Sequence, residues 1–293
     1  MEKKLAGLYI KGKYPVGGII ESLSNTKKDS PMSIQLLIVD PQIDFCDPKG
    51  ALYVAGADKD MERLANLIET KAGHIDDIRV TLDSHRFLHV AHPIMWKDKD
   101  GNHPAPFTLI TSADIDSKKW MATNPGFQKR LADYVKKLEA NKKYLLVIWP
   151  PHCLIGSQGH SVYPRLFEAL QKWEQRFATV DYVTKGSNMF TEHYSAVKAD
   201  VTDPDDPTTQ INTNLIKKLQ TADSIWISGE ALSHCVASTV RDIAQEFGDD
   251  QVKKFVLITD TCSPVTRFET QAEDFMREMI SKGMQLAKTS ELL

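Results

Sequence analysis

The sequence predicts an α/β protein built on a parallel sheet, and two patterns along the chain support this prediction. Beyond residue 33, short apolar or β-branched runs alternate with longer amphipathic stretches, which is typical of βαβ units. In one of those stretches Val236, Val240 and Ile243 recur at helical spacing. With 293 residues, the chain is long enough for one large α/β domain or two smaller ones.

The two kinds of run give the expected elements in chain order. The apolar and β-branched runs predict strands over 35–39, 78–82, 144–148, 180–184, 224–228 and 255–259. The amphipathic stretches predict helices over 58–71, 126–140, 165–177, 208–221, 233–247 and 269–282. Two stretches break the alternation: 96–125 is rich in turn residues and 199–207 in Asp and Pro. Long loops in compact domains usually form lids or binding surfaces.

The first 33 residues have a different composition from the rest. Gly, Pro, Ser and Lys are scattered through them around one short apolar patch. We therefore expect residues 1–33 to be an N-terminal extension that carries no chemistry, followed by the main domain over 34–293.

Charge and composition limit the partners of the protein. The net charge of -3 and pI near 6.3 give no basic field for nucleic acid. No signal peptide and no apolar run long enough for a membrane span is found, so we expect a soluble cytoplasmic protein. The four cysteines are widely spaced, which fits reduced thiols better than a disulfide framework. A small-molecule partner is expected, and the sequence leaves homo-oligomerisation open.

Reactive side chains follow the expected strands at their ends. Asp40, Asp83 and Lys185 each end one, and Cys235 lies just beyond another, at the start of a helix. In a parallel sheet these ends share one edge, where ligands of open α/β proteins bind. The free N–H groups of a helix N-terminus, with a nearby lysine, favour a cysteine thiolate. Taken singly, these residues are more often a turn cap, a surface charge or a buried small hydrophobe.

Histidines gather near the second of those strand ends. Asp83 and His85 are followed by His89 and His92, and His152 lies in a loop stiffened by two prolines. His and Asp side chains suit zinc, iron or manganese. Histidines in Pro-rich loops also pack and hydrogen-bond without metal, so the set is more informative than any one member.

Together these segments resemble the nicotinamidase branch of the isochorismatase-like cysteine hydrolase superfamily. The matching segments occur in that family's order: VDPQIDF (39–45), DSH (83–85), WPPHCLIGSQG (149–159), KG (185–186) and GEALSHCV (229–236).

The resemblance implies both a fold and a site. It implies a three-layer α/β/α fold with a six-stranded, mostly parallel sheet, and a cis peptide between Glu230 and Ala231. The implied roles are as follows: a catalytic triad of Asp40, Lys185 and Cys235; an oxyanion hole from the N–H groups of Ala231 and Cys235; a divalent metal, zinc first, on Asp83, His85 and His152; and aromatic substrate walls from Phe45 and Trp149.

The chain also departs from the family's pattern. A segment over about 96–143 is inserted on the metal side, where it could reshape the substrate pocket. Position 230 is Glu where an aliphatic residue is common, which would place a charge close to the crevice. Either His89 or His92 corresponds to the family's additional histidine, as a fourth metal ligand.

The function expected from these residues is a metal-containing cysteine amidohydrolase. It would hydrolyse a small heteroaromatic amide to an acid and ammonia through a thioester on Cys235. The alternatives are a related hydrolase of another small amide or ureide, a hydrolase on the same fold that uses metal-bound hydroxide, and a binding protein that has lost turnover. The presence of all three triad residues argues against the last. A vinyl-ether hydrolase of the isochorismatase type has no need for the sulfur.

Overall fold

The computed structural model describes residues 32–142 and 144–292. The expected N-terminal extension over 1–33 therefore lies almost entirely outside the described residues. From Met32 onward the chain forms one compact unit.

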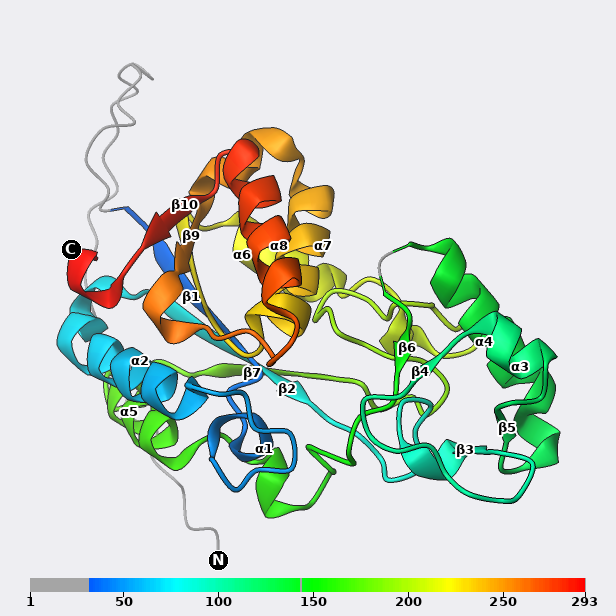
Figure 1. Ribbon diagram of the computed structural model, residues 1–293. Helices are drawn as coiled ribbons and strands as arrows, with labels where there is room; N and C mark the ends of the chain where they lie inside the picture. The colour runs from blue at the N-terminus through cyan, green and yellow to red at the C-terminus, as the bar shows by residue number, and fades with distance from the viewer. Residues whose placement is uncertain (1–31, 143, 293) are drawn as a thin grey trace, which may run out of the picture. The chain divides into compact units, whose positions relative to one another are not determined.

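A six-stranded sheet, parallel throughout, runs through the middle of this unit (Figure 1). Its strand order is β10-β9-β8-β1-β2-β7. The strands are β1 (Ile34–Val39), β2 (Asp77–Asp83), β7 (Asp181–Lys185), β8 (Ser224–Gly229), β9 (Phe255–Ile258) and β10 (Gln285–Ala287). The predicted α/β class and the implied six-stranded parallel sheet are confirmed.

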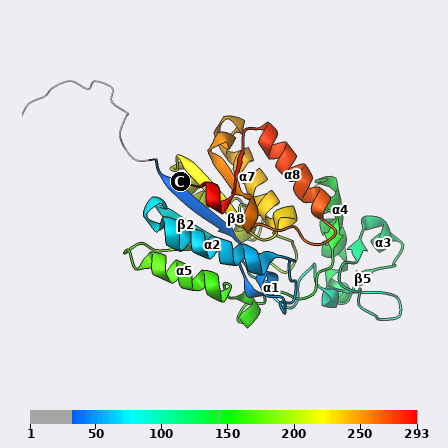
Figure 2. The ribbon, with the colours of Figure 1, turned by 60° about the vertical axis from the view of Figure 1, so that its left-hand side comes forward.

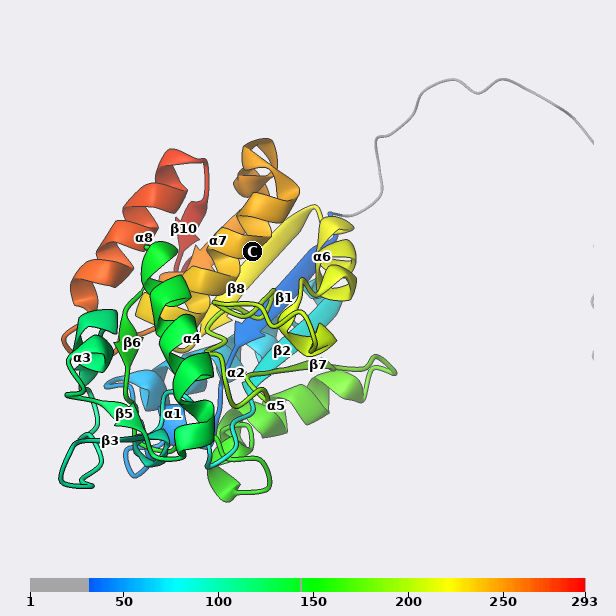
Figure 3. The same cartoon turned by 90° about the vertical axis from the view of Figure 1, so that its right-hand side faces the viewer.

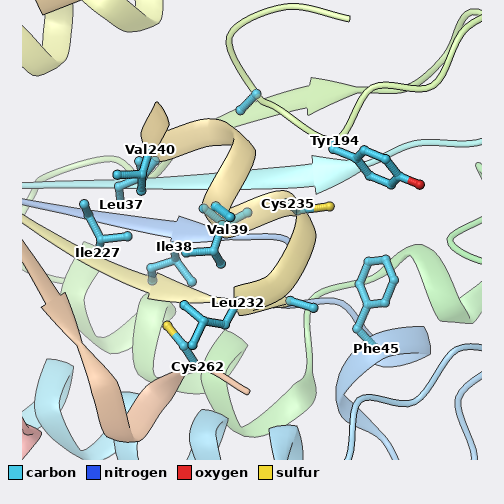
Figure 4. Packing of buried hydrophobic residues seen from close by; sticks show 14 of the residues in the cluster. Leu37, Ile38, Val39, Phe45, Tyr194, Ile227, Leu232, Cys235, Val240 and Cys262 are labelled. Carbon is cyan, nitrogen blue, oxygen red and sulfur yellow. The ribbon is translucent and has the colours of Figure 1, made fainter. Parts of the chain in front are cut away.

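β1 and β8 form the centre of the sheet and are buried along their whole length. Strands buried on both faces read as near-continuous apolar runs, which is why the sequence reveals them clearly. Side chains from both strands, including Leu37, Ile38 and Ile227, pack together in the core (Figure 4). This packing fixes where the carboxyl ends of the two strands lie.

Helices cover both faces of the sheet (Figures 1 and 3). α2 and α5 lie against one face, and α6, α7 and α8 against the other. The helices are α1 (Ile43–Cys46), α2 (Ala57–Lys71), α3 (Ser112–Asp116), α4 (Gln128–Ala140), α5 (Pro164–Glu174), α6 (Thr213–Gln220), α7 (Ala237–Phe247) and α8 (Glu269–Ser281). Within the described residues, none of them is long and apolar enough to cross a membrane.

Two sequence expectations are wrong in detail. The run 144–148 is not a strand of the main sheet, because only Leu146–Val147 is extended, and it pairs antiparallel with β4. The sixth strand is β10, a short edge strand with two exposed residues that give no apolar signal. The expected helix over 208–221 begins only at Thr213, where the Asn212 side chain accepts the N–H of Leu215 as an N-cap.

Residues 96–142 and 144–147 form a small layer of their own beyond the carboxyl ends of the sheet strands (Figures 1 and 2). They hold α3, α4 and two antiparallel strand pairs. These pairs are β3 (Trp96–Lys97) with β5 (Met121–Ala122), and β4 (Leu109–Ile110) with β6 (Leu146–Val147). Because it lies at the end of the sheet where the reactive residues emerge, this segment contributes to the surroundings of the site.

A charged cluster joins the two helices on one face of the sheet. Glu69 of α2 pairs with Arg165 and Lys172 of α5, at 2.9 and 2.8 Å. Hydrogen bonds from Arg165 and Lys172 lower the pKa of Glu69 from 4.5 to about 2. A carboxylate with a lowered pKa stabilises the fold above its unfolded pKa, and that contribution is lost as pH falls toward its folded pKa.

We therefore predict that Glu69→Gln destabilises the protein by up to about 1 kcal/mol near pH 7, since the cluster is partly exposed. The difference from wild type should hold above pH 4.5 and shrink as pH falls toward 2. Urea unfolding across this pH range measures it, with Glu273→Gln, an exposed residue of α8, as the control. A difference that stays constant down to the lowest pH would contradict the account.

Candidate active site

The carboxyl ends of three adjacent strands bring together the residues that the sequence analysis singled out. Asp40 follows β1, Asp83 ends β2 and Lys185 ends β7, directly opposite Asp83 in the strand register. Gly229 ends β8 beside Val39, with φ of +116°, and an added Cβ would lie 2.0 Å from the Val39 carbonyl oxygen. Only glycine fits there, so β1 and the end of β8 can approach this closely.

The Lys185 ammonium group lies at the centre of this cluster and is 4% exposed. Its Nζ lies 2.9 Å from Asp40 Oδ2, 3.1 Å from Asp83 Oδ1 and 3.6 Å from Cys235 Sγ. It also donates to the carbonyl oxygen of His193 at 2.9 Å. The structure thus places the three residues of the implied triad in contact through one buried cation.

The protonation of the cluster differs from the sequence-based expectation of a resting thiolate. Burial raises the pKa of the Cys235 thiol well above its usual value, although Lys185 opposes this and Asp40 adds to it. Burial also raises the pKa of Asp40, against the effect of Lys185. Cys235 lies in a π-helical turn, Leu232–Val236, that leads into α7. Desolvation therefore favours the thiol form of Cys235 over the thiolate, with the Asp40 carboxyl group beside it.

The backbone before Cys235 has the arrangement that the resemblance implies. The Glu230–Ala231 peptide bond is cis. Within the described ranges, the N–H of Ala231 has no hydrogen-bond acceptor. It remains available to bind an oxyanion, which is the role that the resemblance implies for it together with the N–H of Cys235.

Glu230 does not bring a charge into the crevice. Its side chain is fully buried and accepts the N–H of Ser263, and burial raises the pKa of its carboxyl well above the usual value. The departure at position 230 therefore places a buried acid against the backbone of Ser263.

The implied metal ligands converge beside the cluster. Asp83 Oδ2 lies 2.9 Å from His85 Nε2 and 3.4 Å from His152 Nε2. The Nδ1 atoms of His85 and His152 lie 3.2 and 2.8 Å from the carbonyl oxygens of Gly186 and Pro150, so both Nε2 atoms face the carboxylate and can serve as ligand atoms. Two imidazole nitrogens and a carboxylate oxygen at this spacing suit a zinc-like cation.

The two candidates for a fourth ligand differ in what they already bind. Both ring nitrogens of His89 are engaged, with the N–H of Ala91 and the carbonyl of Thr191. His92 donates to the carbonyl of Phe87, and its buried Nε2 has no partner within residues 32–142 and 144–292. His89 belongs to a group of three side chains, with His85 and Glu192, whose ligand atoms lie within 4.8 Å of one another. His92 belongs to no such group among the described residues.

Sequence reasoning missed Glu192, a buried carboxylate beside these histidines. Its Oε1 lies 3.9 Å from His85 Nε2, and its Oε2 has no hydrogen-bond partner in the described part of the chain. Glu192 lies in the loop after β7, where no periodic pattern marks it. Its nearness to Asp83 and His85 arises only from the fold.

A narrow pocket opens onto Cys235 between aromatic side chains. Figure 4 shows the Cys235 sulfur pointing toward the space between Phe45 and Tyr194. Trp149, the second expected wall, also lines this pocket, and its Nε1 donates to the Tyr194 hydroxyl at 3.0 Å. The sequence analysis identified Phe45 and Trp149 but gave no role to Tyr194, which lies in a loop, or to His234, although His234 directly precedes Cys235.

Comparison with known proteins supports the resemblance seen in the sequence. No protein-family model matches the chain. The nicotinamidase of Saccharomyces cerevisiae is 23% identical over 212 residues, which are 72% of this chain and 81% of the yeast protein.

Solved structures of similar fold include nicotinamidases and pyrazinamidases. A nicotinamidase/pyrazinamidase of Acinetobacter baumannii has a TM-score of 0.58 and 24% identity, covering 90% of this chain and 100% of that one. The pyrazinamidase of Pyrococcus horikoshii, in complex with zinc, has a TM-score of 0.53 and 19% identity, covering 87% and 99%.

The chain thus has the three-layer α/β fold of the nicotinamidases, and the predicted resemblance to that branch is confirmed. The fold is shared along nearly the whole length of the solved structures. At these identities, the chemistry of this chain has to be argued from its own side chains.

The metal group gives a direct prediction. His152→Ala removes one of three converging ligands, so it should weaken zinc binding at least about tenfold. Isothermal titration of metal-free protein with zinc measures this, and His103→Ala, an exposed histidine outside the group, is the control. Equal zinc affinity in wild type and His152→Ala would show that these residues do not hold the ion.

Proposed function

We propose that this protein is a cysteine amidohydrolase that converts a small aromatic carboxamide to its acid and ammonia. One observation carries the proposal: a buried ammonium, that of Lys185, contacts Asp40 at 2.9 Å and the Cys235 sulfur at 3.6 Å, at the base of an aromatic pocket. A nucleophile, a base and a cation that orients both are the parts that acyl transfer needs. The similarity to nicotinamidases supports the same reaction.

In the first half of the reaction, Cys235 Sγ attacks the amide carbonyl carbon. The thiol proton passes to Asp40, whose raised pKa makes it a competent base. The N–H groups of Ala231 and Cys235 bind the developing oxyanion. Collapse of the tetrahedral intermediate breaks the C–N bond, and Asp40 returns the proton to the departing nitrogen as ammonia leaves. The product of this half is a thioester on Cys235.

In the second half, Asp40 takes a proton from a water molecule that attacks the thioester. The C–S bond then breaks, the acid is released, and the proton returns to the sulfur. Throughout both halves Lys185 keeps its positive charge, because two carboxylates raise its pKa well above the usual value against the effect of burial. Its role is to hold Asp40 and Cys235 in place and to balance charge as the proton moves.

The surroundings favour a flat aromatic substrate. Phe45, Trp149 and Tyr194 line the pocket above the sulfur. Planar side chains of this kind pack well on a planar ring. A heteroaromatic amide such as nicotinamide or pyrazinamide is therefore the substrate class that fits best.

Asp83, His85 and His152 would hold a divalent metal, with zinc first because a zinc complex is known for a neighbour of the same fold. When bound, the cation would supply a Lewis acid that orients the substrate ring or its waters. The ligand atoms of these three residues lie within 4.8 Å of one another, and Glu192 adds a carboxylate oxygen 3.9 Å from His85 Nε2.

A hydrolase that uses metal-bound hydroxide is the second candidate, because Asp83 and His152 line the same pocket as Cys235. The two candidates respond differently to removal of the sulfur. Cys235→Ala abolishes activity if the sulfur attacks the carbonyl, and it leaves most of the activity if hydroxide does.

We predict that Cys235→Ser lowers kcat/KM for nicotinamide or pyrazinamide by at least about 10³-fold, because a serine hydroxyl is a far weaker nucleophile than a cysteine thiol near neutral pH. Ammonia release measures this. Cys262→Ala is the matched control, since this buried cysteine lies beside Leu232 and away from the pocket (Figure 4). Retention of activity in Cys235→Ser, with the control unchanged, would contradict the covalent mechanism.

A further inference from the structure

We propose that His234 selects the substrate by donating a hydrogen bond from its Nε2 to an acceptor on the aromatic ring. The inference rests on the proposed function and narrows it to carboxamides whose ring carries a second acceptor, such as an added ring nitrogen or a ring oxygen.

His234 belongs to the wall of the pocket and is held there by aromatic rings. It precedes Cys235 in the turn, is 3% exposed, and lines the same pocket as Phe45 and Trp149. Tyr144 stacks on it at 5.5 Å between ring centroids and 20° between planes. Phe268 and Trp149 meet it nearly edge-on, at 4.7 and 5.4 Å. With a ring on each of these sides, the imidazole has little freedom to turn.

Hydrogen bonding decides which nitrogen of His234 carries the proton. Ser233 Oγ lies 2.8 Å from His234 Nδ1 and also accepts the N–H of Val265 at 3.1 Å. The hydroxyl hydrogen of Ser233 has no other acceptor among the described residues, so it is donated to Nδ1. Burial lowers the pKa of His234 to about 4, so the ring is neutral at pH 7. The single ring proton is therefore on Nε2.

This Nε2–H is a buried donor without a hydrogen-bond acceptor anywhere in residues 32–142 and 144–292. An unpaired buried donor is costly, so a substrate atom that accepts this N–H would gain a hydrogen bond without displacing another partner. Among the other pocket groups, Trp149 donates to the Tyr194 hydroxyl, and Asp83 and His152 face each other in the metal group. The hydroxyl of Tyr194 is the other neutral donor of the pocket, so a variant at Tyr194 belongs in the test.

The test compares nicotinamide with two analogues that keep its ring nitrogen and add one acceptor: pyrazine-2-carboxamide and pyrimidine-5-carboxamide. One of them should exceed nicotinamide in kcat/KM by about tenfold or more in the wild type, as expected for one added hydrogen bond to a buried donor. His234→Phe keeps the ring shape and removes the donor, so this advantage should disappear. The readout is the ratio of kcat/KM values within each variant.

Two further variants make the result specific. Tyr144→Phe keeps the stacked ring and should retain the ratio. Ser233→Ala frees the tautomer of His234 and should reduce the ratio. The inference is overturned if no analogue surpasses nicotinamide, if the preference survives in His234→Phe, or if Tyr194→Phe abolishes it while His234→Phe does not. A wild type that releases ammonia from none of the amides would instead refute the proposed function.

Discussion

The buried Lys185 ammonium is the contact on which the site depends. It lies within 3.1 Å of two carboxylates from neighbouring strands and 3.6 Å from the Cys235 sulfur. Burying any one of these charges alone would be very unfavourable, and the cation compensates for both carboxylates at once. The same contact sets the distance between base and nucleophile. Stability and reactivity therefore depend on one group.

The fold supplies this arrangement through the parallel sheet. β1, β2, β7 and β8 lie side by side, so the residues that follow them meet although they are distant in sequence. Gly229 allows β8 to pass close to Val39, and the turn after it presents Cys235. The loop that contains His152 then brings a histidine to Asp83, whose carboxylate contacts both Lys185 and the proposed metal group. Asp83 thereby links the two halves of the site.

The sequence was sufficient to predict residues that lie next to a recognisable strand, because the apolar run of the strand marks their position. Asp40, Asp83, Lys185 and Cys235 were found because each adjoins a recognisable apolar run. β10 was missed because it is a short, exposed edge strand, and 144–148 was misassigned because an apolar run does not reveal its pairing partner. Glu192 and Tyr194 approach the site only through loop conformation and tertiary packing, and the direction of the His234 side chain beside Cys235 is set by the rings packed around it. The protonation of Cys235 depends on desolvation, which no sequence pattern expresses.

The central claim is that the Cys235 sulfur forms the covalent bond to the substrate. Intact-protein and peptide mass spectrometry of the wild type, acid-quenched during turnover of nicotinamide or pyrazinamide, tests it most directly. The account predicts an acyl adduct on the peptide that carries Cys235 and none in Cys235→Ala. Steady ammonia release by the wild type, with Cys235 unmodified at every quench time and undiminished release by Cys235→Ala, would contradict it.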